Sequence, residues 1–118
     1  MARTRRLLST DSLASNKVVN PAGDDLGKIE TFMIDPEDAR VEYAVLSFGG
    51  FLGMGNKLFA VPMQALTLVP GEHKFPLNEK RERLENAPGF DKDHWPDMHD
   101  RTWGDKIYDY YGFVPYWR

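Results

Sequence analysis

The pattern of hydrophobic and polar positions between Asn16 and Leu77 predicts a series of short strands. Runs of β-branched and aromatic residues alternate there with Gly, Pro, Asn and Asp, which are typical of tight turns. The expected strands cover residues 17–19, 26–35, 40–48, 57–62, 66–69 and 74–77. Residues 40–48 are the most strand-like, so we expect this strand to lie centrally. The pattern predicts a mainly β unit of about six short strands.

The apolar phase changes inside the segment 26–35. Ile29 shares its parity with Thr31, whereas Phe32 and Ile34 have the opposite parity. A β-bulge inserts one residue and so reverses the alternation of side chains between the two faces of a sheet. A bulge near Thr31 is therefore expected to bring Ile29, Phe32 and Ile34 to the same interior.

Two helices are predicted after the strands. Asn78 can accept a hydrogen bond from an amide of a first turn, and so cap a short helix over residues 79–85. A second helix is expected over residues 101–111, with Gly112 as a suitable stop. One face of this helix carries Trp103, Ile107, Tyr110 and Tyr111. A face of this kind must be buried against another surface.

Aromatic residues are concentrated at the end of the chain. Nine of the fifteen lie in the last 29 residues, so residues 87–118 are an acidic, aromatic extension rather than a solvated linker. Large rings serve as anchors in cores and in interfaces. Either the extension packs on the β unit of its own chain or it docks on a neighbouring copy. The expected contact residues are Trp95, Trp103, Ile107, Tyr110, Tyr111, Tyr116 and Trp117. Stacking on nucleic acid is disfavoured, because six aspartates rather than basic residues interleave these rings.

The composition of the chain excludes several classes of function. A chain of 118 residues favours one domain, and a net charge of −3 argues against wholesale wrapping of nucleic acid. Residues 1–15 form a basic arm that we expect to be flexible; its paired arginines lack the apolar stretch of an export signal. No membrane insertion is expected. The absence of cysteine excludes disulfides and thiolate chemistry, and it is compatible with a cytoplasmic location.

The sequence offers little catalytic chemistry. The glycine-rich connection after residue 48 lacks the lysine and the following helix of a phosphate-binding loop. Its residues Phe51, Leu52 and Met54 are expected to pack locally or against a second subunit. No serine has a recognisable base nearby, so we expect no enzymatic activity and no cofactor. The weak candidates for metal ligands are His94, His99, Asp91, Asp93 and Asp97, but the five-residue separation of the histidines does not match a helical zinc pair.

Four motifs in order carry a family resemblance. They are Leu26-Gly27-Lys28-Ile29-Glu30, Ile34-Asp35, Tyr43-Ala44-Val45-Leu46-Ser47-Phe48-Gly49-Gly50 and Lys57-Leu58-Phe59-Ala60-Val61-Pro62. Together they resemble the PRC-barrel domain, over residues 16–86. The extension 87–118 further resembles small stand-alone bacterial members. The resemblance implies a small β-barrel with a short helix, followed here by an aromatic-rich helical C-terminal extension.

The resemblance also implies adaptor work on large assemblies, such as the binding of a ribosomal protein or the support of electron transfer in a membrane complex. We therefore expect a non-catalytic, cytoplasmic protein-interaction module that associates with itself as a homodimer or higher oligomer and binds a further protein complex. Two alternatives stay open. One is a factor associated with RNA processing or ribosome assembly; the other is a small-ligand or metal-binding protein that uses His94 and His99.

Overall fold

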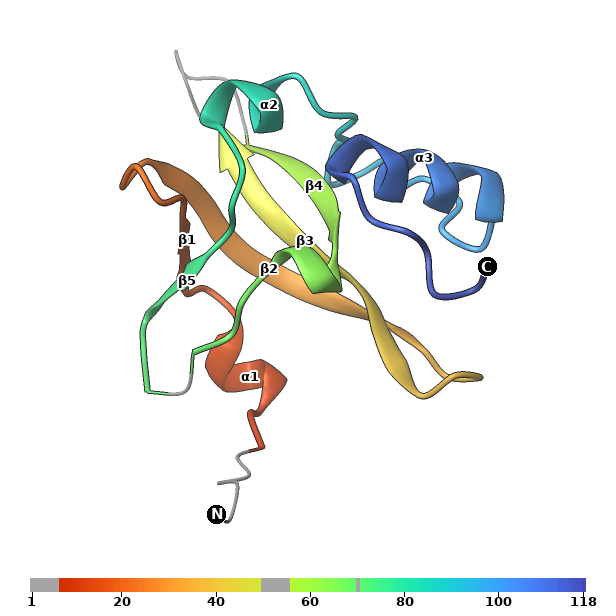
Figure 1. Ribbon diagram of the computed structural model, residues 1–118, viewed down its shortest axis with the longest axis horizontal. Coiled ribbons are helices and arrows are strands. Elements are labelled where there is room, and N and C mark those ends of the chain that lie inside the picture. The colour runs from red at the N-terminus through yellow and green to blue at the C-terminus, as the bar shows by residue number, and fades with distance from the viewer. Residues whose placement is uncertain (1–6, 50–55, 70) are drawn as a thin grey trace.

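The computed structural model describes residues 7–49, 56–69 and 71–118 (Figure 1). The elements are α1 (Thr10–Leu13), β1 (Lys17–Val19), β2 (Asp25–Asp35), β3 (Arg40–Gly49), β4 (Asn56–Pro62), the 3-10 helix η2 (Met63–Ala65), β5 (Lys74–Pro76), α2 (Arg81–Glu85) and α3 (Arg101–Tyr111). The mainly β fold class is confirmed, but the described residues form five strands rather than about six, and their sheet is not closed into a barrel.

The five strands form one sheet in the order β4-β3-β2-β1-β5. β1 and β5 are parallel, and the other neighbours are antiparallel. β3 is flanked on both sides, as expected for the most strand-like segment. The strand predicted at residues 66–69 is not formed; an isolated bridge pairs Leu66 with Leu77 instead. Next to this bridge, the amide of Thr67 donates to the carbonyl of Pro76.

The predicted bulge in β2 is confirmed. The pairing of β2 with β3 shifts between Ile29 and Thr31, so that Glu30 is the extra residue. Ile29 and Phe32 therefore both pair with core residues of β3, namely Leu46 and Ala44. The burial expected for Ile34 is wrong, because this side chain is 61% exposed.

A second bulge lies beside Ile34. Met33 pairs with Tyr43, but Ile34 pairs with Val41, so that Glu42 is an extra residue in β3. This extra residue belongs to β3 and leaves the alternation along β2 unchanged. Ile34 is exposed although it has the parity of Phe32, because it lies one residue before the end of β2 and pairs with Val41, which is not a core residue.

The start of the chain contributes to the core. α1 lies inside the range expected to be a flexible arm, yet Leu13 is buried among the core residues. The amide of Ser15 donates to the carbonyl of Ile29, which fixes α1 against β2. The part of the predicted arm from Thr10 onward is therefore packed on the sheet.

α2 begins later than predicted. Its N-cap residue is Lys80, so Asn78 does not cap it. Residues before the helix remain extended, and the Glu79 side chain accepts from the amide of Lys80 and pairs with Arg83 one turn later. Among the described residues, no side chain caps α2.

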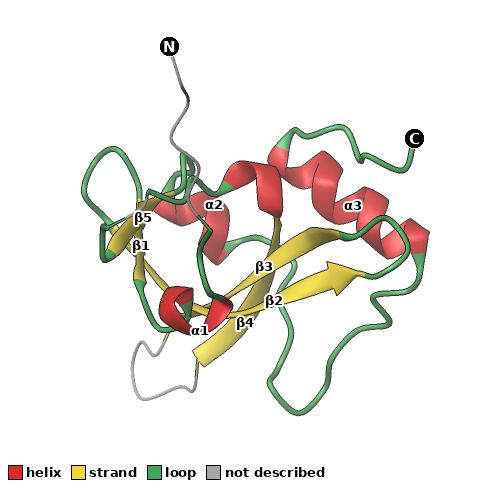
Figure 2. Ribbon diagram, turned by 90° about the horizontal axis from the view of Figure 1, so that it is seen from below, coloured by secondary structure: helices red, strands yellow, loops and turns green. Residues whose placement is uncertain are grey.

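α3 confirms the predicted amphipathic helix. Asp100 accepts from the amide of Thr102 at its start, and Gly112 ends it in the left-handed conformation with φ 80°. The helix lies against β3 and β4 of its own chain (Figures 1 and 2). Its core-facing residues are Gly104, Ile107, Tyr108 and Tyr111. Tyr108 was absent from the face predicted from the sequence.

Gly104 allows this close packing. A Cβ atom at this position would lie 2.6 Å from the Tyr43 hydroxyl and 3.1 Å from the Trp117 ring. The Tyr43 ring in turn contacts Trp103 and Tyr108 edge to face, at centroid distances of 5.4 and 5.8 Å. The extension therefore supplies part of the hydrophobic core of the described structure.

Candidate functional site

A pocket of about 410 Å³ lies between the β2–β3 hairpin and the start of α3. Its apolar lining comes from Met33, Ile34, Pro36, Tyr43 and Met98. Its polar lining comes from Asp35, Glu37, Glu42, His99 and Arg101. The extension therefore forms one wall of the pocket and the hairpin forms the other.

The second bulge places Glu42 in this wall. Because Glu42 is the extra residue of β3, its side chain does not follow the normal alternation, and it is 8% exposed. Its Oε1 atom lies 3.2 Å from Arg101 Nη1 and 3.2 Å from the Tyr116 hydroxyl. A buried carboxylate of this kind is tolerated because a cation and a hydrogen-bond donor satisfy it.

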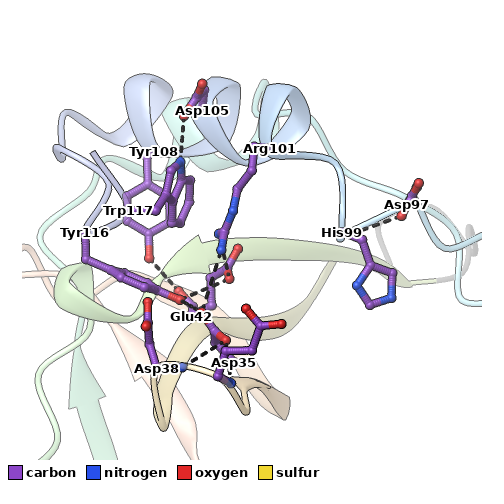
Figure 3. A network of polar contacts seen from close by, with 11 residues as sticks. Asp35, Asp38, Glu42, Asp97, His99, Arg101, Asp105, Tyr108, Tyr116 and Trp117 are labelled. Carbon is purple, nitrogen blue, oxygen red and sulfur yellow. Dashed lines mark hydrogen bonds and ion pairs between the residues drawn. The ribbon is translucent and has the colours of Figure 1, made fainter.

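Asp35 ends β2 and faces the same two partners (Figure 3). Its Oδ1 atom accepts from the amides of Glu37 and Asp38, which fixes the hairpin turn. Its Oδ2 atom accepts from the Tyr116 hydroxyl at 2.6 Å and lies 3.7 Å from Arg101 Nη2. The hydrogen bond from Tyr116 is the main reason why the pKa of Asp35 is lowered.

The Tyr116 hydroxyl thus lies between two carboxylates and has a single proton to donate to them. The shorter contact identifies Asp35 as the acceptor of that proton. Burial, and then the hydrogen bond to Asp35, raise the pKa of Tyr116. The Arg40 guanidinium lies 3.9 Å from the centroid of the Tyr116 ring and covers it.

Trp117 fastens the end of the chain to α3. Its indole nitrogen donates to Asp105 Oδ1 at 3.0 Å, and the Arg101 guanidinium lies 4.2 Å from the ring centroid (Figure 3). Below it, the Tyr108 hydroxyl donates to the Glu42 carbonyl at 2.7 Å. Burial raises the pKa of Tyr108 to about 12, so this hydroxyl keeps its proton at neutral pH.

The two carboxylates at the back of the pocket are held by other side chains. Asp35 and Glu42 are both engaged by Arg101 and Tyr116, so neither is free to act as a general acid or base. Among the described residues that line the pocket, none is a serine, threonine, cysteine or lysine. The fixed charges instead surround two flexible methionine side chains and the exposed Ile34.

The structure distributes the predicted contact residues between core and surface. Ile107 and Tyr111 are 1% and 8% exposed and lie in the core of their own chain. Trp103, Tyr110, Tyr116 and Trp117 are half-buried. The Tyr110 hydroxyl donates to the Arg83 carbonyl and so joins α3 to α2. Trp95 is 42% exposed. Phe51, Leu52 and Met54 lie outside the described residues.

The candidate metal ligands do not come together. Within residues 7–49, 56–69 and 71–118, no three His, Asp or Glu side chains form a group that could hold a metal ion. Asp97 Oδ1 instead accepts from the amide of His99, and the amide of His94 donates to the carbonyl of Asp91. Asp97 therefore serves the turn that leads into α3.

Sequence reasoning missed the polar network of Asp35, Glu42, Arg101 and Tyr116. Glu42 did give a signal, since it is the one charged residue within the apolar run 41–48. A buried charge needs a partner, but the partner lies 59 residues away in sequence. Asp35 gave a weaker signal, because a turn explains an aspartate before Pro36 equally well.

The family model described as the PRC-barrel domain matches residues 8–84. No curated protein matches the chain. In the described parts of the chain, none of the helices has the length and apolar character needed to cross a bilayer.

Proposed function

Because the chain belongs to the PRC-barrel family, we propose that it is a non-catalytic adaptor that associates with a second copy and binds a partner protein through the pocket beside the β2–β3 hairpin. The observation that carries the proposal is the pocket itself, where exposed apolar side chains adjoin charges held in fixed positions.

The lining suggests the chemistry of the partner. Met33 and Met98 are flexible, polarizable side chains that adapt to an apolar group, and Ile34 offers 61% of its surface beside them. The Glu37 carboxylate is exposed next to this apolar surface and is held by no ion pair with a described residue. The pocket therefore suits a protein segment that carries an apolar side chain beside a lysine or arginine.

The network keeps this pocket preformed. Arg101 and Tyr116 join the hairpin to the extension through two carboxylates, so the two walls are held together before any partner arrives. A preformed site loses less conformational entropy when a partner binds. The proposal includes a bacterial cytoplasmic location, which fits a chain that has no cysteine to oxidise.

Photo-crosslinking tests the pocket. A benzophenone amino acid at position 34 should capture one dominant protein in cells, whereas the same group at position 114 should not. Val114 is a good control, because it is also an exposed aliphatic side chain, at 75%, and does not line the pocket.

The captured protein is then purified and titrated by calorimetry. Ile34→Glu should raise the Kd at least tenfold, and Val114→Glu should leave it within twofold. Equal effects of the two substitutions, or equal capture from the two positions, would overturn the assignment of the pocket.

A further inference from the structure

Three lysines stand in a row across three neighbouring strands. Lys17 of β1 pairs with Lys28 of β2 on one side and with Lys74 of β5 on the other. All three side chains are exposed. The adjacent pair, Val18 and Phe75, is 0% and 2% exposed, so the lysines point to the outer face of the sheet. We call these three residues the lysine row.

The lysine row is unfavourable for the isolated chain. Neighbouring strands lie about 4.8 Å apart, and like charges directly opposite each other destabilise a sheet. None of the three lysines forms an ion pair with another residue in the described parts of the chain. An anionic surface laid against the row would remove this repulsion.

The same chain carries a matching anionic surface. Residues 91–100, between α2 and α3, hold four exposed aspartates and one lysine; the aspartates are Asp91, Asp93, Asp97 and Asp100. No ion pair to a described cation engages any of the four. We call residues 91–100 the aspartate loop. Its formal charge of about −3, with histidine neutral, opposes the charge of the lysine row.

An aromatic anchor sits within the aspartate loop. Trp95 is 42% exposed, although its ring packs on Phe90 at a centroid distance of 4.9 Å and its indole nitrogen donates to the Lys92 carbonyl. The ring is therefore held in place with part of its surface uncovered. Tryptophans presented in this way are typical of the residues that dominate binding energy in interfaces.

The two surfaces lie at opposite edges of the sheet. The lysine row occupies β2, β1 and β5, whereas the aspartate loop begins next to β4, where Phe90 pairs with Leu58. β4 and β5 are the two ends of the strand order, and Figure 1 shows β1 and β5 far from α3. The row and the loop of one chain are thus separated, and they can meet only between two copies.

We propose that the lysine row of one copy binds the aspartate loop of a second copy, with Trp95 at the centre of the contact. In a two-fold dimer this contact occurs twice, since each copy offers one row and one loop. The inference rests on the self-association included in the proposed function and names the surfaces that carry it.

Reciprocal charge reversal tests this pairing. One variant carries Lys17→Glu and Lys74→Glu, and the other carries Asp91→Lys and Asp93→Lys. The matched controls are Lys106→Glu and Asp109→Lys, which reverse exposed charges on α3 outside both surfaces. All six side chains are exposed, and circular dichroism checks that each variant is folded.

The expected result follows from the symmetry. The wild type and the controls should have a light-scattering mass near twice 13.6 kDa, and each double variant should dissociate at least tenfold more readily. An equimolar mixture of the two double variants should restore the dimer, because the reversed row then faces the reversed loop while the natural row faces the natural loop. The dimer should also weaken as the salt concentration rises.

Three outcomes would overturn the inference, and they are distinguishable. If both double variants remain dimeric, the pairing is wrong but self-association stands. If the wild type has a mass of 13.6 kDa up to millimolar concentration, the self-association in the proposed function fails as well. If the wild type is monomeric and its row, but not Lys106, is needed to bind a fluorescent single-stranded 20-nucleotide RNA, the partner of the row is a nucleic acid.

Discussion

The Tyr116 hydroxyl donates to Asp35 Oδ2 at 2.6 Å across a separation of 81 residues in sequence. This bond joins Tyr116, which lies outside the residues matched by the family model, to Asp35 at the end of β2, which lies inside them. The pocket exists because the two regions are held in this way. The contact therefore provides the most direct probe of how the extension supports the barrel.

Removing the Tyr116 hydroxyl should loosen the extension. In Tyr116→Phe the ring keeps its contact with Arg40, but Asp35 and Glu42 lose a common donor. We expect a Tm about 5 °C lower, as for a lost hydrogen bond to a charged group in a small domain. Calorimetry of the two proteins at pH 7 measures the difference. An unchanged Tm would show that the bond contributes nothing to stability.

Acid should selectively remove the contribution of Asp35. In the folded state the pKa of the Asp35 carboxyl lies below its ordinary value of 3.8. The unfolded chain therefore protonates this carboxylate at a higher pH than the folded chain does. The stabilisation is present above the unfolded pKa and is lost as pH falls through the folded pKa. The difference in free energy of unfolding between wild type and Asp35→Asn should therefore shrink from pH 6 to pH 3, as urea titrations can measure. A constant difference would contradict the assignment.

Removal of the hydroxyl should affect the free energy of unfolding differently at two buried tyrosines, Tyr108 and Tyr43. Tyr108→Phe removes the donor to the Glu42 carbonyl and should cost about 1–2 kcal/mol in free energy of unfolding. The buried Tyr43 hydroxyl has no hydrogen-bond partner among the described residues, so Tyr43→Phe should be neutral or stabilising. Urea unfolding of both variants measures this. Equal losses would show that the Tyr43 hydroxyl is also satisfied.

Gly104→Ala should destabilise the protein, although alanine normally favours a helix over glycine by about 1 kcal/mol. The new Cβ would lie 2.6 Å from the Tyr43 hydroxyl, which forces α3 away from β3. We expect a net cost of about 1–3 kcal/mol, typical of overpacking. The double variant with Tyr43→Phe should recover part of that cost, because the nearest clashing atom is gone. Strict additivity of the two substitutions would rule out this explanation.

Lys17→Glu should stabilise the isolated chain. Lys17 is the middle member of the lysine row, so one reversal turns two repulsions into two attractions. A Tm about 2–4 °C higher is expected at low salt, and the gain should disappear in 1 M salt. The measurement is made at concentrations where light scattering shows single chains. Lys106→Glu is the control, and an equal gain there would point to a general charge effect.

Local patterns predicted the elements of this fold but not their long-range partners. The parity change around Thr31 predicted the first bulge, and the spacing of Ile107 and Tyr111 predicted the buried face of α3. Nothing local predicted the bulge at Glu42, because a bulge of this kind is defined by the register of two strands. The exposure of Ile34 was missed because parity does not show where along a strand the core ends.

The polar network was missed because its members are distant in sequence. Glu42 is 59 residues from Arg101 and 74 residues from Tyr116, and neither separation has a periodicity that can be recognised. The cap predicted at Asn78 is wrong on a smaller scale, because the chain is still extended at Lys80 and no described side chain caps α2.

The bulge at Glu42 links the length of β3 to one of the contacts that hold the extension. With one residue fewer, β3 would continue its regular pairing with β2, and the carboxylate that meets Arg101 would be lost. Deletion at this one position would thus remove one polar anchor of the extension, whereas the core contacts of Ile107, Tyr108 and Tyr111 would remain. A change of one residue in strand length can therefore alter how firmly an added wall is held against the sheet.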